Sequence, residues 1–341
     1  MRVLLTGHQG YLGTVMSPVL AAAGHDVVGL DSGLFADCVL GPTPQDPPGL
    51  AIDLRDVTPA HLGGFDAVVH LAALSNDPLG SLAPELTYAI NHHASVRLAR
   101  LAKQAGVGRF LYASTCSVYG ASGRAGLVDE DAPLRPVTPY AESKVRVEAE
   151  LHDLADEDFC PVYMRNATAF GFSPRLRADI VLNNLTAHAH LTGEVLVLSD
   201  GTPWRPLVHA EDIAHAFAAA LVAPRAAVHD RAFNIGTEDN NVTVAEIAQC
   251  VVEAVPGARM RITGEAGADP RSYRVDFARF RDAVPGFACR RSVKDGALEL
   301  VDAYRELCLT RHAFERCFTR LARLSERAAA GEIDDTLRRR P

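Results

Sequence analysis

The chain has 341 residues, 48% of them hydrophobic, with 34 lysine and arginine residues against 42 aspartate and glutamate residues and a net charge of −8. This length accommodates two domains or one large domain with a lobe, and a mildly acidic chain without long basic blocks is not expected to bind nucleic acid. No apolar run reaches the roughly eighteen residues of a membrane span, so we expect no membrane partner.

The N-terminal stretch predicts a dinucleotide-binding turn. Residues 2–6 are a short apolar run, which indicates a strand and not a signal peptide. In a strand–turn–helix unit, the first glycine permits the tight turn, the second lets a pyrophosphate approach the backbone, and the third lets the helix pack on the strand. The spacing here is G-x-x-G-x-x-G. The residues predicted to bind the cofactor are Gly7, Gln9, Gly10, Tyr11, Leu12 and Gly13.

The second predicted strand, residues 25–30, ends at Asp31. An acidic side chain at this point can accept hydrogen bonds from both ribose hydroxyls and repels a 2′-phosphate, which favours NAD over NADP. The alternative is a solvated aspartate at a strand end. Residues 33–49 contain four prolines and are expected to form a loop.

The third and fourth predicted strands, residues 50–52 and 65–71, end in further cofactor-binding candidates. Asp53 and Leu54 follow the third strand, where Asp53 can accept a hydrogen bond from an adenine amino group. Small residues at the end of the fourth strand let a cofactor lie across the strand ends; these are Leu71, Ala72 and Ala73. The next predicted element is a helix over residues 82–104. Its Asn91 is either a packing residue or holds backbone or water near the active site.

Hydroxyl groups follow the fifth predicted strand, residues 108–113. The carboxyl end of a central parallel strand faces the ligand crevice. We therefore expect Thr115, Cys116 and Ser117 to line the substrate site.

A helix is predicted to begin at Pro139, because proline suits a first helical position and Thr138 is a good N-cap. It places Tyr140 and Lys144 one turn apart on the same face. An ammonium group lowers the pKa of a nearby phenol, so the pair can exchange a proton with an alcohol or a ketone. The alternative is a surface helix that happens to carry one tyrosine and one lysine.

The order of these elements predicts the fold class. With a sixth strand at residues 160–164, strands alternate mainly with helices, which indicates an α/β fold with a doubly wound parallel (Rossmann) sheet over residues 1–165. Residues 166–330 are predicted to form a smaller C-terminal α/β substrate lobe, with later segments returning to the first domain. Residues 331–341 form a polar tail that is expected to fray. Seven cysteines without a Cys-x-x-Cys pair predict no disulfide framework and no metal site, and we expect a cytoplasmic protein.

Taken together, the motifs resemble those of the extended short-chain dehydrogenase/reductase superfamily and, within it, the NAD-dependent sugar-nucleotide epimerase/dehydratase family. The resemblance covers residues 1–276. It rests on Thr6-Gly7-x-x-Gly10-x-x-Gly13, Asp31, Asp53, His70-Leu71-Ala72-Ala73, Ser114-Thr115-x-x-Val118-Tyr119-Gly120 and Tyr140-x-x-x-Lys144. It implies NAD as the cofactor and a catalytic triad of Thr115, Tyr140 and Lys144, in which Lys144 also holds the nicotinamide ribose.

The same resemblance implies a nucleotide-diphosphate sugar as the substrate. Residues 165–175 resemble the family's Arg-x-x-Asn-x-x-Gly-Pro segment loosely, with Asn166 directly after Arg165. Asn183 lies where the family places an asparagine near the diphosphate. Two arginine motifs carry Arg205 and Arg271 to the same diphosphate, and guanidinium groups suit phosphate oxygens. The alternative for these arginines is a surface salt bridge.

Two departures from the family pattern bear on the reaction. Dehydratases of the family carry Asp-Glu directly after the catalytic threonine, where this chain has Cys116 and Ser117, so 4,6-dehydration is not expected. Some members use a cysteine near this position as a second acid/base, but one residue later, and a packing role is favoured for Cys116. The resulting hypothesis is an epimerase that oxidises C4 transiently. The alternatives are a 4-ketoreductase and a non-catalytic NAD-binding regulator, and a homodimer is expected.

Overall fold

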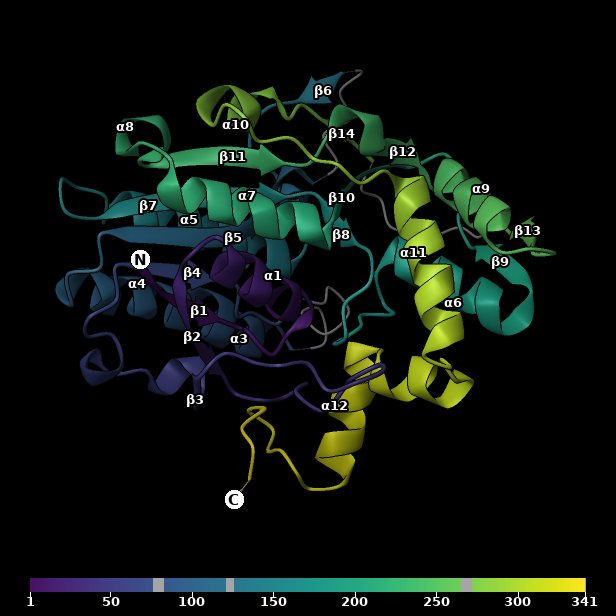
Figure 1. Ribbon diagram of the computed structural model, residues 1–341, viewed down its shortest axis with the longest axis horizontal. Helices are drawn as coiled ribbons and strands as arrows, with labels where there is room; N and C mark the ends of the chain where they lie inside the picture. Colours follow the sequence, from purple (N-terminus) through teal and green to yellow (C-terminus); the bar gives the residue numbers. More distant parts are fainter. Residues whose placement is uncertain (76–82, 121–125, 265–271, 341) are drawn as a thin grey trace.

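A parallel sheet of seven strands forms the centre of the computed structural model, which describes residues 1–75, 83–120, 126–264 and 272–340 (Figure 1). The strand order is β11-β7-β5-β4-β1-β2-β3. The bounds are β1 (Arg2–Thr6), β2 (Asp26–Asp31), β3 (Gly49–Ala51), β4 (Ala67–His70), β5 (Arg109–Thr115), β7 (Cys160–Asn166) and β11 (Arg231–Ile235). The predicted doubly wound α/β fold is confirmed.

Both faces of the sheet are covered by helices, because alternate strand residues point to opposite sides. On one face Val3 and Leu5 of β1 join a core with α1 (Tyr11–Ala22) and α7 (Ala210–Val222). On the other, Leu4 joins a core with α4 (Ser95–Gln104) and α5 (Pro139–His152). The carboxyl ends of the strands point toward the C-terminal lobe, as the arrowhead of β11 shows in Figure 1.

The helix predicted over residues 82–104 is interrupted. Its described part consists of α3 (Pro84–Thr87), a π-helical segment Tyr88–Ala94, and α4. Asn91 lies in the π-helical segment and is buried. A wider turn of this kind re-aims a side chain within an otherwise regular helix, and such turns are common at functional sites.

The C-terminal lobe packs three helices around its own core: α6 (Val181–Thr192), α9 (Val244–Ala254) and α11 (Val293–Glu306). Capping boxes start two of them, Thr243 with Glu246 at α9 and Ser292 with Asp295 at α11. In the described part of the chain, three small sheets complete the lobe and its boundary with the first domain. One has three strands, β12 (Asn241–Thr243), β10 (Trp204–His209) and β8 (Thr168–Phe170). The other two are pairs of strands, β13 (Arg259–Ile262) with β9 (Glu194–Val197), and β14 (Arg274–Val275) with β6 (Leu127–Val128).

Segments from the C-terminal half return to the first domain. Strand β11 pairs with β7 at the edge of the large sheet, and α7 packs against α1. The remaining helices are α8 (Arg225–Val228), α10 (Ala278–Ala283) and α12 (Arg320–Ala329). In the described part of the chain, no helix is long and apolar enough to cross a membrane, and no group of three or more His, Cys, Asp or Glu side chains is placed to hold a metal ion.

The C-terminal tail differs from the prediction, because residues 331–340, although mostly exposed, are anchored to the rest of the fold. Ile333 is buried and lies in one apolar cluster with Leu34, Leu74 and Leu324. The tail also folds on itself, since the Asp334 N–H donates to the Arg338 carbonyl at 2.9 Å. The prediction of a frayed tail followed from its polar composition and did not account for Ile333, which anchors the tail.

Candidate active site

The glycine turn has the geometry that a bound dinucleotide requires. Gly7 has a positive φ of 76°, and a Cβ there would lie 2.8 Å from the backbone nitrogen of Ala72. A Cβ on Gly13 would lie 2.1 Å from the carbonyl oxygen of Gly7. Helix α1 starts after Gly10 without a side-chain cap and without an acidic residue in its first turn. Its first N–H groups therefore suit a pyrophosphate, and the turn fits the predicted cofactor.

Asp31 lies beside this turn at the end of β2. Its carboxylate accepts hydrogen bonds from the backbone N–H groups of Gln9, at 3.0 Å, and Gly33, at 2.8 Å. These bonds fix the carboxylate where ribose hydroxyls are bound in this type of fold. The end of β4 lies next to the turn, since the Leu71 and Ala72 N–H groups both donate to Thr6.

Two further cofactor candidates, Asp53 and Asn91, are held by the chain itself. Asp53 caps the short helical turn Leu54–Asp56 and binds the Arg55 guanidinium at 2.6 and 2.8 Å. Burial raises the pKa of Asp53, but the hydrogen bonds from Arg55 outweigh it and hold that pKa below its usual value. Asn91 binds the backbone of Leu74 on both sides, accepting from its N–H at 2.7 Å and donating to its carbonyl at 3.0 Å. Of the roles considered for Asn91, packing or the holding of backbone or water, these bonds fit the holding of backbone.

Lys144 reaches the end of β5 from the helix α5, which begins at Pro139 behind a Thr138 cap as predicted. Its ammonium donates to the Ala113 carbonyl at 2.7 Å and lies 5.6 Å from the centre of the Tyr140 ring. Burial lowers the pKa of Lys144 to about 7, although the Glu148 carboxylate opposes the shift. The structure thus brings the predicted tyrosine and lysine together, with the lysine buried and Tyr140 half-buried.

Thr115 is the last residue of β5, two positions beyond the carbonyl that holds Lys144. It is half-buried, and its Oγ1 accepts from the N–H of Ser117 at 3.1 Å. Cys116 points the other way, into the core, where its thiol donates to the Arg165 carbonyl at 3.1 Å. Burial raises the pKa of this thiol far above its usual range. The packing role favoured for Cys116 fits this position, and a role as acid/base or substrate contact does not.

A buried ion pair between α5 and β7 was not predicted. Arg165 and Glu148 pair at 2.6 Å, and Glu148 also accepts from the Ser114 hydroxyl at 2.5 Å. Arg165 donates further to the Tyr119 hydroxyl and the Glu130 carbonyl. This network holds the negative charge of Glu148 near Lys144, and the only sequence signal for it was the arginine of the loosely matched family segment.

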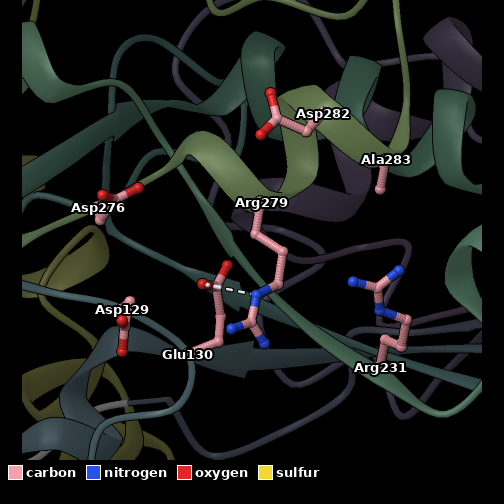
Figure 2. A pocket seen from close by; sticks show the side chains of 7 residues that line it. All are labelled: Asp129, Glu130, Arg231, Asp276, Arg279, Asp282 and Ala283. Atoms are coloured by element: carbon pink, nitrogen blue, oxygen red, sulfur yellow. Dashed lines mark ion pairs between the residues drawn. The ribbon is translucent and has the colours of Figure 1, made fainter.

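A hollow of about 440 Å³ lies at the outer edge of the sheet, beyond this network. Figure 2 shows Arg279 reaching from α10 toward Glu130, with which it pairs at 3.3 Å. Arg231 of β11 lines the same hollow. None of the predicted catalytic or cofactor residues lines it, so we do not assign the reaction to this hollow.

The predicted substrate-side residues have different surroundings. Asn166 donates to the Ser114 carbonyl at 3.3 Å, while its buried Oδ1 has no partner within the described residues. Asn183 is completely buried and binds the backbone of Gly171 and Arg177. Arg205 is half-buried on β10 and donates to the Trp204 carbonyl at 2.9 Å. Arg271 lies outside the described residues.

Arg177 is a further candidate for the site that was not predicted from the sequence. It pairs with Asp179 at 2.9 Å and donates to the Ser75 hydroxyl at 3.0 Å. Burial lowers its pKa, but Asp179 and the nearby Tyr140 raise it above the usual value. Its only sequence signal was its place shortly after the Arg165 segment.

Tyr11 connects the two halves of this site. Its hydroxyl donates to the carbonyl of Gly171 at 2.7 Å, so the cofactor turn is tied directly to the loop that carries Arg177. The positions of Leu12 and Ala73, both half-buried, are compatible with their predicted place beside the cofactor. Contacts of all these residues with a cofactor stay predictions.

Known proteins resemble this chain in sequence and in structure. A sequence profile of the NAD dependent epimerase/dehydratase family matches residues 3–236. A UDP-glucose 4-epimerase of Mycolicibacterium smegmatis is 28% identical over 318 residues, 89% of this chain and 99% of the relative. A dTDP-glucose 4,6-dehydratase of Streptomyces niveus is 28% identical over 333 residues, 90% of this chain and 93% of the relative. The structure of MoeE5 with UDP-glucose and NAD has a TM-score of 0.76 at 28% identity, covering 91% of this chain and 100% of that chain.

Proposed function

Because the chain belongs to the NAD dependent epimerase/dehydratase family, an enzyme family whose cofactor is NAD, we propose that it epimerises a nucleotide sugar at C4. The observation that carries this proposal is the pairing of Tyr140 with Lys144 at the end of β5. The lack of carboxylates directly after Thr115 supports epimerisation over 4,6-dehydration. Because the relatives include a dTDP-glucose 4,6-dehydratase, 4,6-dehydration is the alternative reaction.

In this proposal Tyr140 acts as the general base and later as the general acid. The Thr115 hydroxyl orients the sugar hydroxyl, and the Tyr140 phenolate takes its proton. NAD held at the glycine turn and Asp31 would supply the hydride acceptor at that carbon and, once the ketone has turned over, the hydride donor to its other face. Tyr140 gives its proton back to the carbonyl oxygen as the alcohol re-forms, so the sugar leaves with the same atoms and an inverted centre.

Lys144 supports this cycle electrostatically. Its ammonium stabilises the phenolate of Tyr140. Burial lowers the pKa of Lys144 to about 7 and so disfavours the ammonium form. The nearby Glu148 carboxylate raises that pKa and partly offsets the effect of burial. The buried pair of Glu148 with Arg165 is therefore expected to influence catalysis without touching the sugar.

The nucleotide is proposed to be UDP. The supporting observations are the UDP-glucose 4-epimerase relative and the MoeE5 complex with UDP-glucose. Arg205 and Arg271 are proposed diphosphate contacts. Asn166 is a proposed substrate contact whose Oδ1, unpartnered within the described residues, can accept a hydrogen bond from a substrate hydroxyl. A cytoplasmic location and a homodimer also stay proposals, and gel filtration giving a monomer would remove the second.

The decisive experiment is incubation of the purified enzyme with UDP-glucose and separation of the sugar nucleotides by chromatography. We expect the 4-epimer to form without added NADH, because the cofactor is regenerated in place. Consumption of one equivalent of NADH with a 4-keto sugar would establish the ketoreductase instead. No turnover across a panel of UDP, TDP, GDP and CDP sugars, with NAD bound, would favour a non-catalytic NAD-binding protein.

A further inference from the structure

The C-terminal hook, residues 332–340, is a folded segment at the edge of the cofactor half. Its backbone closes on itself, since the Arg340 N–H donates to the Glu332 carbonyl and the Leu337 N–H to the Asp334 carbonyl, both at 2.9 Å. Ile333 anchors it in the apolar cluster with Leu34 and Leu74. The hook is thus attached to the segments that follow β2 and β4, both of which border the predicted cofactor site.

Polar contacts hold the hook to the segment that follows β3. Arg338 forms two hydrogen bonds with the Asp56 carboxylate, one of them at 3.0 Å. In return, the Arg55 guanidinium donates to the Thr336 carbonyl at 3.0 Å, while its other nitrogens bind Asp53. The hook therefore lies against the turn that carries the predicted adenine-binding aspartate.

Arg339, the residue after Arg338, reaches the part of the predicted cofactor site that follows β2. Its Nη1 lies 3.0 Å from the position that a Cβ on Gly33 would take, so Arg339 sits directly beside Gly33. The Gly33 N–H in turn binds the carboxylate of Asp31. Residues 336–339 thus extend from the end of β3 to the end of β2, and Figure 1 shows this yellow C-terminal segment beside β3.

The Arg339 side chain is available for a ligand. It is exposed, and within the residues that the structure describes its guanidinium has no hydrogen-bond or ion-pair partner. A guanidinium can stack on an aromatic ring and donate to ribose or phosphate oxygens. Because adenosine in this type of fold lies at the ends of β2 and β3, the cation is placed at its rim.

We infer that the hook is part of the NAD site and that Arg339 contacts the adenosine half of the cofactor, slowing its release. The inference rests on NAD as the cofactor of the proposed function. An enzyme that regenerates its cofactor in every cycle gains nothing from releasing it. A segment that borders the adenosine end suits that requirement.

The test measures release of NADH from full-length protein by stopped-flow fluorescence, with excess NAD as the chase. We expect Arg339→Ala to release NADH about tenfold faster, a difference of about 1.4 kcal/mol. Arg339→Lys should recover part of the effect, because the charge remains but the planar fork is lost. Arg338→Ala should also accelerate release, because it frees the hook from Asp56.

Arg340→Ala is the matched control. It removes the adjacent exposed arginine, whose side chain forms no hydrogen bond or ion pair with the described residues, and release should stay within about twofold of the wild type. Equal release rates for Arg339→Ala and Arg340→Ala would overturn the inference. So would an Arg338→Ala protein that melts at a lower temperature but releases NADH at the wild-type rate. The assay needs no sugar, so a failed epimerase assay leaves its result intact.

Discussion

The cofactor half and the substrate half of the site are built in different ways. In the cofactor half, backbone geometry does most of the positioning, as Gly7 and Gly13 approach other chain atoms too closely for a Cβ. In the substrate half, positioning depends on long polar side chains such as Arg177, which pairs with nearby Asp179 and also donates to Ser75, about a hundred residues earlier in the chain. Glycine spacing is therefore readable in a sequence, while the task of an arginine or asparagine depends on its neighbours.

The two halves meet at Tyr140, where we expect the largest effect. Tyr140→Phe should lower kcat by about 1,000-fold, because general acid–base catalysis by one side chain contributes roughly 10²–10⁴-fold. NAD binding should persist, since the phenyl ring is retained. Steady-state rates with UDP-glucose test this, with Tyr88→Phe as the control, because its hydroxyl binds Glu142 away from the reacting groups. Undiminished turnover with NAD bound would refute the assigned base.

Glu148→Gln probes the buried support of the cofactor half. It leaves Arg165 buried without a counter-charge, which should cost roughly 3 kcal/mol of unfolding free energy. The loss of negative charge should also lower the pKa of Lys144 further, moving the alkaline limb of the rate profile to lower pH. Urea unfolding and a pH–rate profile measure the two effects. Glu150→Gln on the same helix, a half-exposed partner of both Arg100 and the His92 ring, should cost less than Glu148→Gln.

Gly13→Ala tests the claim that backbone geometry organises the cofactor half. The added methyl would lie 2.1 Å from the Gly7 carbonyl, so the turn must shift, at a cost of about 3 kcal/mol and with weaker NADH binding. Fluorescence titration and urea unfolding are the measurements. Gly108→Ala places its methyl no closer than 3.9 Å to Asp158 and should leave NADH affinity unchanged. Equal behaviour of the two variants would contradict the comparison.

Asn183→Ala tests whether the substrate half uses this residue as scaffold. The change leaves backbone groups of Gly171 and Arg177 without partners, so we expect about 2 kcal/mol lower stability. Asn184→Ala removes a single bond to the Ala178 carbonyl and should cost less. A large rise in KM for the nucleotide sugar with unchanged stability would instead assign Asn183 to the diphosphate.

The smallest effect is the pH dependence carried by His70, which lies between Thr6 and Ser95 at 2.7 and 2.8 Å. Burial, reinforced by Lys144, lowers its pKa to about 3. The unfolded chain takes up this proton below about pH 6.5 and the native protein does not, so stability falls as pH decreases between these values. The slope is at most about 1.4 kcal/mol per pH unit. His70→Gln should show a shallower decline from pH 7 to 5 in urea unfolding; an unchanged slope would reject this assignment.

Local rules in the sequence determined the glycine turn, the start of α5 at Pro139 and the spacing of Tyr140 from Lys144, because capping, turn geometry and helical periodicity act over a few residues. Tertiary structure decided the rest. The bond of Arg177 to Ser75, the bond of Asn183 to Tyr11 and the place of the hook beside Gly33 depend on residues far apart in the chain. Such pairings leave no periodic signal, since packing of a few apolar anchors such as Ile333 selects them only when the whole chain folds.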